Sequence, residues 1–185
     1  ATGVDLRQVP RSVPVPHVVS TLAFDFDVTG RFADPVLTGT ALFADSEFIG
    51  AGLASGASGF IDTSVSPFRY SGEGELRDVD LNRFGRDLQM AWLTEPRYAG
   101  TLRGQFHVEG AGADVATMAL QGGGHLTEAR LCAGALSEAE VGVSIANGSL
   151  HATYDGQLGA IDPSIPMQDP LYAARLSGHA RADVA

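Results

Sequence analysis

The chain has 185 residues, of which 44% are hydrophobic and 18% are charged, a balance typical of a folded domain rather than a disordered segment. Its formal net charge of −10 disfavours nucleic acid as a partner, because phosphate binding requires a basic surface. The single cysteine, Cys132, excludes a framework of internal disulfides. No apolar run reaches the roughly 18 residues of a membrane-spanning helix, so the segment is expected to be soluble.

One strand pattern occurs three times along the chain. Residues 16–30, "PHVVSTLAFDFDVTG", share their Pro, Thr-Leu, Phe, Val and Gly positions with residues 96–110, "PRYAGTLRGQFHVEG", at a constant offset of 80 residues. A third copy begins at Pro170, at an offset of 74 from the second. In each copy apolar and polar residues alternate, which predicts a β-strand with one apolar and one solvated face. The recurring apolar residues are Leu22/Leu102/Leu176, Phe26/Phe106 and Val28/Val108.

Other elements recur in the same order. "YSGEGELRDVD" from Tyr70 parallels "YDGQLGAID" from Tyr154, and "ADSEFIGAGL" parallels "TEARLCAGAL". A Val-Asp or Ile-Asp pair at Val4, Val79 and Ile161 precedes the proline that opens each copy. The order predicts one continuous repeat array. We assign a junction to 1–16, β repeat 1 with its junction to 17–96, β repeat 2 with its junction to 97–170, and the first strand of a third repeat to 171–185.

The predicted fold is all-β, with mostly antiparallel strands in two tandem repeats of about 75 to 85 residues. Tight turns such as Asn147-Gly148 favour antiparallel hairpins. The repeats are expected to form a curved, elongated β-groove, shaped like a taco, with short helical junctions at 79–92 and 161–169. Five strands are expected in each repeat: 17–29, 35–45, 47–54, 58–66 and 67–78 in the first, and 97–109, 113–123, 124–136, 139–147 and 149–160 in the second.

The sequence contains no convincing catalytic, cofactor or metal site. Its five histidines, at 17, 107, 125, 151 and 179, have no metal-ligand spacing. The pairs Asp25/Asp27 and Glu73/Glu75 could in principle serve glycoside hydrolysis, but a polar outer face is the simpler interpretation. Gly-rich stretches lack the phosphate-binding patterns, and the chain has no lysine for a P-loop. The chain is therefore expected to be non-enzymatic and to need no cofactor.

The strongest feature is the apolar face of the strands. Its bulky residues are interspersed with glycine and alanine, so the face could line a groove or the core of a sandwich, and composition does not separate the two. In a groove it would bind acyl chains through the hydrophobic effect, at about 0.8 kcal/mol for each CH₂ buried. The predicted lining residues are Leu22, Phe24, Phe26, Val28, Tyr70, Leu76, Leu102, Phe106, Val108, Val141, Val143, Ile145, Leu150, Tyr154 and Leu176.

From Val4 to Val184 the chain resembles the repeating region of the AsmA-like/TamB superfamily of bacterial envelope proteins. The motifs that carry the resemblance are "YSGEGELRDVDLNRFG", "YAGTLRGQFHVEG" and "LTEARLCAGALSEAEVGVSIANGSLHATYDGQLGAID". The resemblance implies a β-groove in the periplasm, anchored by an N-terminal helix in the inner membrane, and a role in phospholipid transport or outer-membrane biogenesis. This chain would be a middle segment, with phospholipid acyl chains as its partners and its membrane anchor outside the sequence.

Two other classes remain open. The first is a surface or adhesion module, built as a repetitive β-helix or β-sandwich with a closed, dry core. The second is a carbohydrate-active enzyme on a β scaffold, which needs two acids facing each other in a cleft.

Overall fold

The computed structural model describes residues 1–9, 19–31, 36–48, 50–87, 91–112, 117–146 and 148–184. Most of these residues lie in β-strands. In chain order the strands are β1 (Ser20–Thr21), β2 (Phe24–Arg31), β3 (Val36–Phe43), β4 (Ser46–Phe48), β5 (Ala51–Leu53), β6 (Ser58–Asp62), β7 (Arg69–Asp80), β8 (Gly100–Ala111), β9 (Ala119–Leu131), β10 (Gly134–Ala146), β11 (Ser149–Ile161) and β12 (Leu176–Val184).

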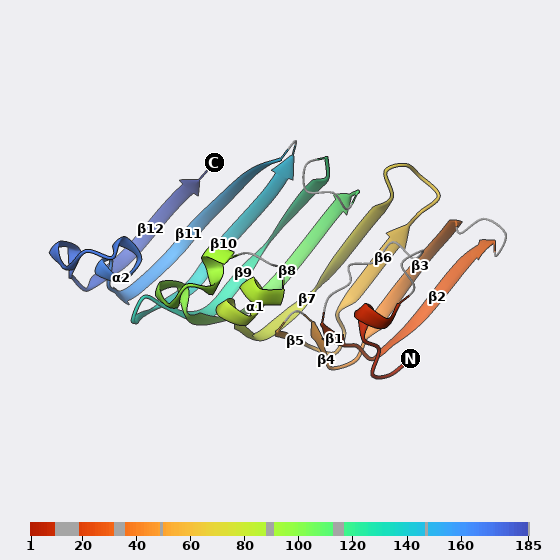
Figure 1. Ribbon diagram of the computed structural model, residues 1–185, viewed down its shortest axis with the longest axis horizontal. Coiled ribbons are helices and arrows are strands. Elements are labelled where there is room, and N and C mark those ends of the chain that lie inside the picture. The colour runs from red at the N-terminus through yellow and green to blue at the C-terminus, as the bar shows by residue number, and fades with distance from the viewer. Residues whose placement is uncertain are drawn as a thin grey trace.

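All twelve strands belong to one sheet, and every pair of neighbours is antiparallel. From β7 to β12 each strand lies beside the next one in the chain, as Figure 1 shows. Within the described ranges no second sheet packs against this one. The predicted all-β, antiparallel fold is therefore confirmed, and the sheet is open, as a groove requires.

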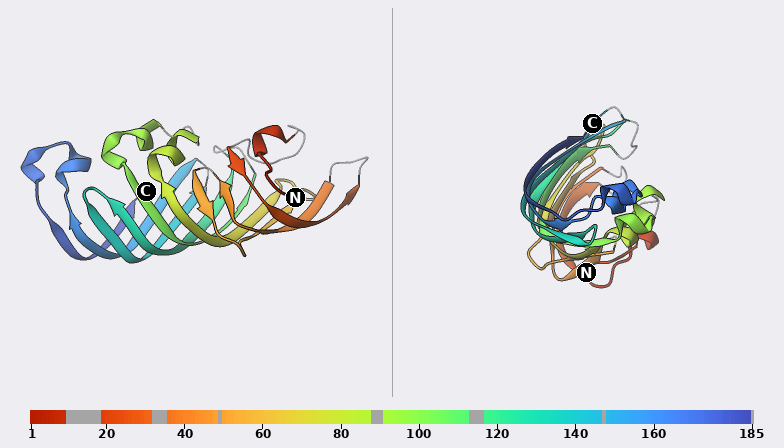
Figure 2. Two further views of the ribbon diagram at one scale, coloured as in Figure 1. Left: turned by 90° about the horizontal axis from the view of Figure 1, so that it is seen from below. Right: turned by 90° about the vertical axis from the view of Figure 1, so that its left-hand side faces the viewer.

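Short helices lie along one side of the sheet. They are η1 (Leu6–Gln8), then α1 (Leu81–Asp87), η2 (Ala91–Thr94) and η3 (Pro96–Tyr98) between β7 and β8, and finally α2 (Ser164–Met167) and η4 (Pro170–Tyr172) between β11 and β12. Figure 2 shows the sheet curved into a trough, with these helices gathered along one rim on its concave side. We call this rim the helical rim. The helical junctions expected from the sequence are present.

The second repeat contains four long strands, β8 to β11, and the prediction of five is wrong. The expected boundary between 123 and 124 falls inside β9, and the turn lies instead at Cys132 and Ala133. Their φ angles of 51° and 60° match the two positive values of a type I′ hairpin. The glycines at the expected boundary do not form a turn. They allow β9 to lie close to β8, because a Cβ atom on Gly122 would lie only 3.0 Å from the carbonyl oxygen of His107.

The first repeat has the same four strand positions, but three of them are interrupted. By register, β1 and β2 together correspond to β8, β3 and β4 to β9, and β5 and β6 to β10. The repeated leucines have equivalent neighbours in all three copies. These cross-strand pairs are Val4–Leu22, Val79–Leu102 and Ile161–Leu176.

An aspartate caps the start of each helical junction. The Oδ1 atom of Asp80 accepts a hydrogen bond of 2.9 Å from the backbone N–H of Arg83, at the start of α1. Asp5 accepts in the same way from Arg7, and Asp162 from Ser164. Each bond satisfies a backbone donor that has no partner within its own helix. This capping accounts for the recurrence of the Val-Asp and Ile-Asp pairs.

The core is thin. Ala139 is fully buried and packs with Leu126 and Ala129, but no large side chain in the described ranges is completely buried. The accessible surface of 11364 Å² exceeds the roughly 8,400 Å² expected of a compact monomer of 19.2 kDa. The open face of the sheet accounts for this additional surface.

A glycine faces an alanine at the same position of each repeat, Gly74 against Ala57 and Gly156 against Ala139. A Cβ atom added to either glycine would overlap the methyl group of the alanine. We expect Gly156→Ala to lower the free energy of unfolding by about 1–3 kcal/mol, as overpacking of a core does. Gly159→Ala is the control, because its new methyl would keep an ordinary distance of 3.6 Å from the carbonyl oxygen of Ala135. Urea unfolding followed by circular dichroism measures both, and equal losses would contradict the expectation.

The capping bond at α1 provides a second test. We expect Asp80→Ala to destabilise the protein by about 1 kcal/mol, the usual cost of losing an N-cap acceptor. Glu73→Ala on the same strand should stay within about 0.5 kcal/mol of the parent, because Glu73 is exposed and its hydrogen bond to Ser58 is long, at 3.5 Å. Thermal unfolding of both variants makes the comparison, and an unchanged midpoint for Asp80→Ala would refute the capping role.

Candidate functional site: the apolar face of the sheet

Strand register gathers apolar and small residues on one face of the sheet, which we call the apolar face. Residues that pair across neighbouring strands form rows perpendicular to the strands. On this face each row consists of apolar or small residues and continues from the first repeat into the second. One such row is Phe26, Ala41, Gly59, Gly72, Val108, Gly122, Val143, Ala152 and Val184. A parallel row is Val28, Gly39, Ile61, Tyr70, Gly110, Leu120, Ile145 and Leu150.

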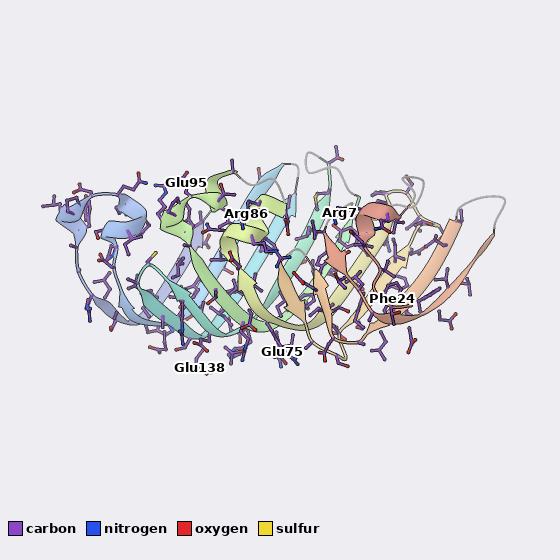
Figure 3. All side chains as sticks on the ribbon, turned by 60° about the horizontal axis from the view of Figure 1, so that its bottom comes forward. Arg7, Phe24, Glu75, Arg86, Glu95 and Glu138 are labelled. Atoms are coloured by element: carbon purple, nitrogen blue, oxygen red, sulfur yellow. The ribbon has the colours of Figure 1, made fainter. Side chains whose placement is uncertain are left out.

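The apolar face lines the concave side of the trough. Figure 3 shows Phe24 inside the trough, whereas Glu75 and Glu138 lie on its convex side. The ring centroid of Phe24 is 5.7 Å from that of Phe26 and 5.6 Å from that of Phe43, so aromatic side chains cluster at this end. Curvature brings side chains on the concave side closer together, which increases their contact without a second layer.

All fifteen predicted lining residues lie on the apolar face by register and by strand alternation. Their burial differs. Leu22 is only 5% exposed, against Val4 at the helical rim, and therefore belongs to the core rather than to an accessible surface. Phe26 is 59% exposed and Val143 is 36% exposed, so both are available to a ligand. The side chain of Leu150 lies outside the described part of the structure.

Large and small residues alternate across the apolar face. The ring of Tyr70 covers Gly110, where a Cβ atom would lie about 2.5 Å from the ring. Phe106 likewise lies near Gly72 and Gly74 on the neighbouring strand. Burial raises the pKa of the Tyr70 hydroxyl above its ordinary value near 10, and the side chain is uncharged at neutral pH with or without this shift. The glycines thus make room for aromatic rings, and the surface stays uncharged.

A shallow hollow of about 580 Å³ opens at the strand ends away from the helical rim. Its lining spans five neighbouring strands, β6 to β10. Most of the lining, including Ser71, Glu109, Gln121 and Ser144, belongs to the polar convex face, and the apolar face contributes Tyr70, Gly110, Leu120 and Ile145. Of these residues, Tyr70 and Ile145 are among the predicted lining residues.

The opposite, convex face is polar. His125 on β9 lies between two glutamates of β10, with its Nδ1 atom 2.9 Å from Glu140 Oε1 and its Nε2 atom 3.5 Å from Glu138 Oε2. The hydrogen bond that His125 donates to Glu140, together with the charges of both glutamates, raises the pKa of His125. Further pairs join β11 and β12, between His151 and Asp183 and between His179 and Asp155.

The acidic pairs considered for catalysis also lie on the convex face. Asp25 and Glu73 occupy one cross-strand row, separated by the partners Leu42 and Ser58. Each is exposed, and the two carboxylates therefore do not face each other across a cleft. Among the described residues, no group of three or more His, Cys, Asp or Glu side chains is placed to hold a metal ion.

The predicted lining residues do not include several residues of the apolar face. Phe43 contacts Phe24, Leu120 lines the hollow, and Val184 at the end of β12 is 63% exposed. Phe43 and Leu120 could have been found by continuing the alternation from each predicted strand through its hairpin. Leu120 lies inside the strand expected over 113–123, two residues before the glycine run 122–124.

No protein-family model matches the chain, and comparisons with curated proteins and with solved structures also give no match. Among the helices of the described ranges, none combines the length and the apolar composition needed to cross a membrane.

The environment of His125 predicts a pH dependence. Because its folded-state pKa is raised, the contribution of His125 to stability is fully present below its ordinary value near 6.5 and is lost as pH rises through the folded value. We expect Glu140→Gln to move the pKa of His125 back toward that ordinary value in an NMR titration. Glu109→Gln on β8 is the control. If neither variant moves the His125 titration, the assigned cause is wrong.

Proposed function

We propose that this chain is a non-enzymatic, lipid-binding segment of an AsmA-like protein of the bacterial cell envelope. In this proposal the apolar face holds the acyl chains of phospholipids. The observation that supports it best is the open, concave position of that face, with Phe26 and Val28 roughly half exposed. Exposed apolar surface of this extent usually marks a binding surface.

The dimensions of the trough suit a hydrocarbon chain. Nine strand positions follow each other along the trough, and their eight spacings of about 4.8 Å give a length of roughly 38 Å. A single leaflet of the bilayer core measures about 15 Å, half of the usual thickness. An extended acyl chain therefore fits along the trough, and each CH₂ that it buries contributes about 0.8 kcal/mol.

The open sheet weighs against the adhesion module. A closed sandwich or β-helix needs a second apolar layer to cover the first, and the described residues form a single layer. The separated carboxylates of Asp25 and Glu73 likewise weigh against a glycosidase, whose two acids face each other across the substrate.

The resemblance to AsmA-like proteins adds the cellular setting of the proposal. In this proposal the chain lies on the periplasmic side of the inner membrane and is attached through an anchor outside this segment. Its role there would be phospholipid transport or outer-membrane biogenesis.

Native mass spectrometry of protein purified from bacterial cells without detergent tests the proposal directly. We expect a population of the protein to carry the added mass of one or more phospholipids. Binding of a fluorescent fatty acid then locates the site. Val143→Glu should weaken this binding at least about tenfold, or about 1.4 kcal/mol, because it brings a carboxylate into contact with hydrocarbon.

Ala135→Glu is the matched control, since it adds the same charge to the same strand on the convex face, opposite Arg130 and outside the hollow. This variant should bind the fatty acid as the parent does. Absence of bound lipid together with equal effects of the two variants would overturn the proposal.

A further inference from the structure

The hollow at the strand ends away from the helical rim opens on the convex side of the sheet. Nine of its thirteen lining residues belong to two convex rows, one on each side of the hollow. The other four, from the apolar face, form the row between those two. Their backbone is the floor, because side chains of that row point to the concave side. The hollow is therefore a short trench across the strands, at the upper edge of the sheet in Figure 1, and is separate from the apolar face.

The two walls of the trench differ in character. The first wall runs from β6 to β10 and consists of Phe60, Ser71, Glu109, Gln121 and Ser144. The second wall begins with Arg69 and continues with Ala111, Ala119 and Ala146. The short alanine side chains leave the trench open. Its five strands, at about 4.8 Å for each spacing, give it a length of roughly 19 Å.

Phe60 is an aromatic ring on a polar face. Among the described strands it is the one Phe or Tyr side chain on the convex side, and it is 37% exposed. Its cross-strand partners, Thr40 and Ser71, are both polar. The face of an aromatic ring carries partial negative charge and attracts polarised C–H groups. Phe60 thus offers a stacking surface at one end of the trench.

Two opposite charges line the trench without pairing with each other. Arg69 forms no ion pair within the described ranges, and Asp62, the carboxylate opposite it, is hydrogen-bonded to Ser64 instead. Glu109, a diagonal neighbour of Arg69 on β8, also forms no ion pair with a described residue. The other convex arginines with described side chains are all paired with carboxylates: Arg77, Arg103, Arg130 and Arg181. The guanidinium and the carboxylate of the trench are both available to a ligand.

These groups specify the chemistry of the ligand. A charged ligand would be attracted by one of Arg69 and Glu109 and repelled by the other, so a neutral ligand fits both. A hydroxyl group can serve either residue, because its oxygen accepts from a guanidinium and its hydrogen is donated to a carboxylate. Gln121 and Ser144 continue the row with further donors and acceptors. The net charge of −10 also disfavours an anionic ligand.

We propose that this convex trench is a binding site for a neutral oligosaccharide. The C–H face of one sugar ring stacks on Phe60, and hydroxyl groups bond with Arg69, Glu109 and the amide of Gln121. The length of the trench suits a short chain of sugars rather than a single unit. No hydrolysis is implied, because Glu109 is the one carboxylate among the lining residues. Since the trench and the apolar face lie on opposite sides of the sheet, sugar binding does not depend on lipid binding.

An NMR titration of the whole chain, with its alanine methyl groups labelled with ¹³C, tests the proposal. The probes are maltohexaose, cellohexaose, mannohexaose and N-acetylchitohexaose, all of them neutral. We expect at least one of them to shift the methyl signals of Ala111, Ala119 and Ala146, with a dissociation constant of about 1 mM or tighter. The methyl signal of Ala152, on the apolar face, should not move.

Two pairs of variants test the assigned contacts. Phe60→Ala should weaken the binding about fivefold to tenfold, because the stacking surface is lost. Leu42→Ala is its control, since it also removes an exposed apolar side chain from the convex face but lies outside the trench. Arg69→Gln should weaken the binding about tenfold or more, because a charged donor is lost. Arg77→Gln, on the same strand and face but outside the trench, should bind as the parent does.

Three results would overturn the proposal. The first is that none of the four hexasaccharides shifts the three alanine signals. The second is that each variant and its control bind alike. The third is that hexagalacturonate, an acidic probe of the same length, binds more tightly than every neutral one and gains affinity in Glu109→Gln, which would identify an anionic ligand instead.

Discussion

Backbone hydrogen bonds between neighbouring strands are the interaction on which this structure depends. A sheet that is one layer thick has no second layer to pack against, so burial of side chains alone cannot hold the strands together. The fully buried Ala139 and its neighbours Leu126 and Ala129 form only a small cluster. Curvature adds to this cluster, because it brings the side chains of the concave face together. The twelve strands therefore depend on continuous pairing from β1 to β12.

The helical junctions are a consequence of the same constraint. Where the chain leaves the sheet at Asp80 or Asp162, its backbone donors lose their strand partners and need new ones. The aspartate carboxylates accept from the first helical N–H groups, at Arg83 and Ser164. The following helices then cover the nearby ends of the strands. In this way each repeat closes one rim of the trough and leaves the other side of the concave face open.

The two faces of the sheet take different roles because side chains alternate along each strand. Charges such as Glu140 and Asp155 lie on the convex face, where water solvates them and histidines and arginines pair with them. The concave face receives the residues that water does not favour, among them Phe106 and Val143. An open trough with an uncharged lining is the physical basis on which a lipid-binding role is proposed.

The amino-acid pattern alone specified the strand class, the repeat and most residues of the apolar face. These follow from local alternation, and the offset of 80 residues between Leu22 and Leu102 reappears in their equivalent cross-strand neighbours. The position of Gly122 and Gly124 inside β9 follows from tertiary contacts, because β8, a separate strand, leaves room only for small residues there. The tertiary structure also decided that Leu22 is buried while Phe26 is exposed, and that the sheet stays open rather than folding into a sandwich. Alternation specifies which side of a strand is apolar, but what covers that side depends on contacts between distant segments.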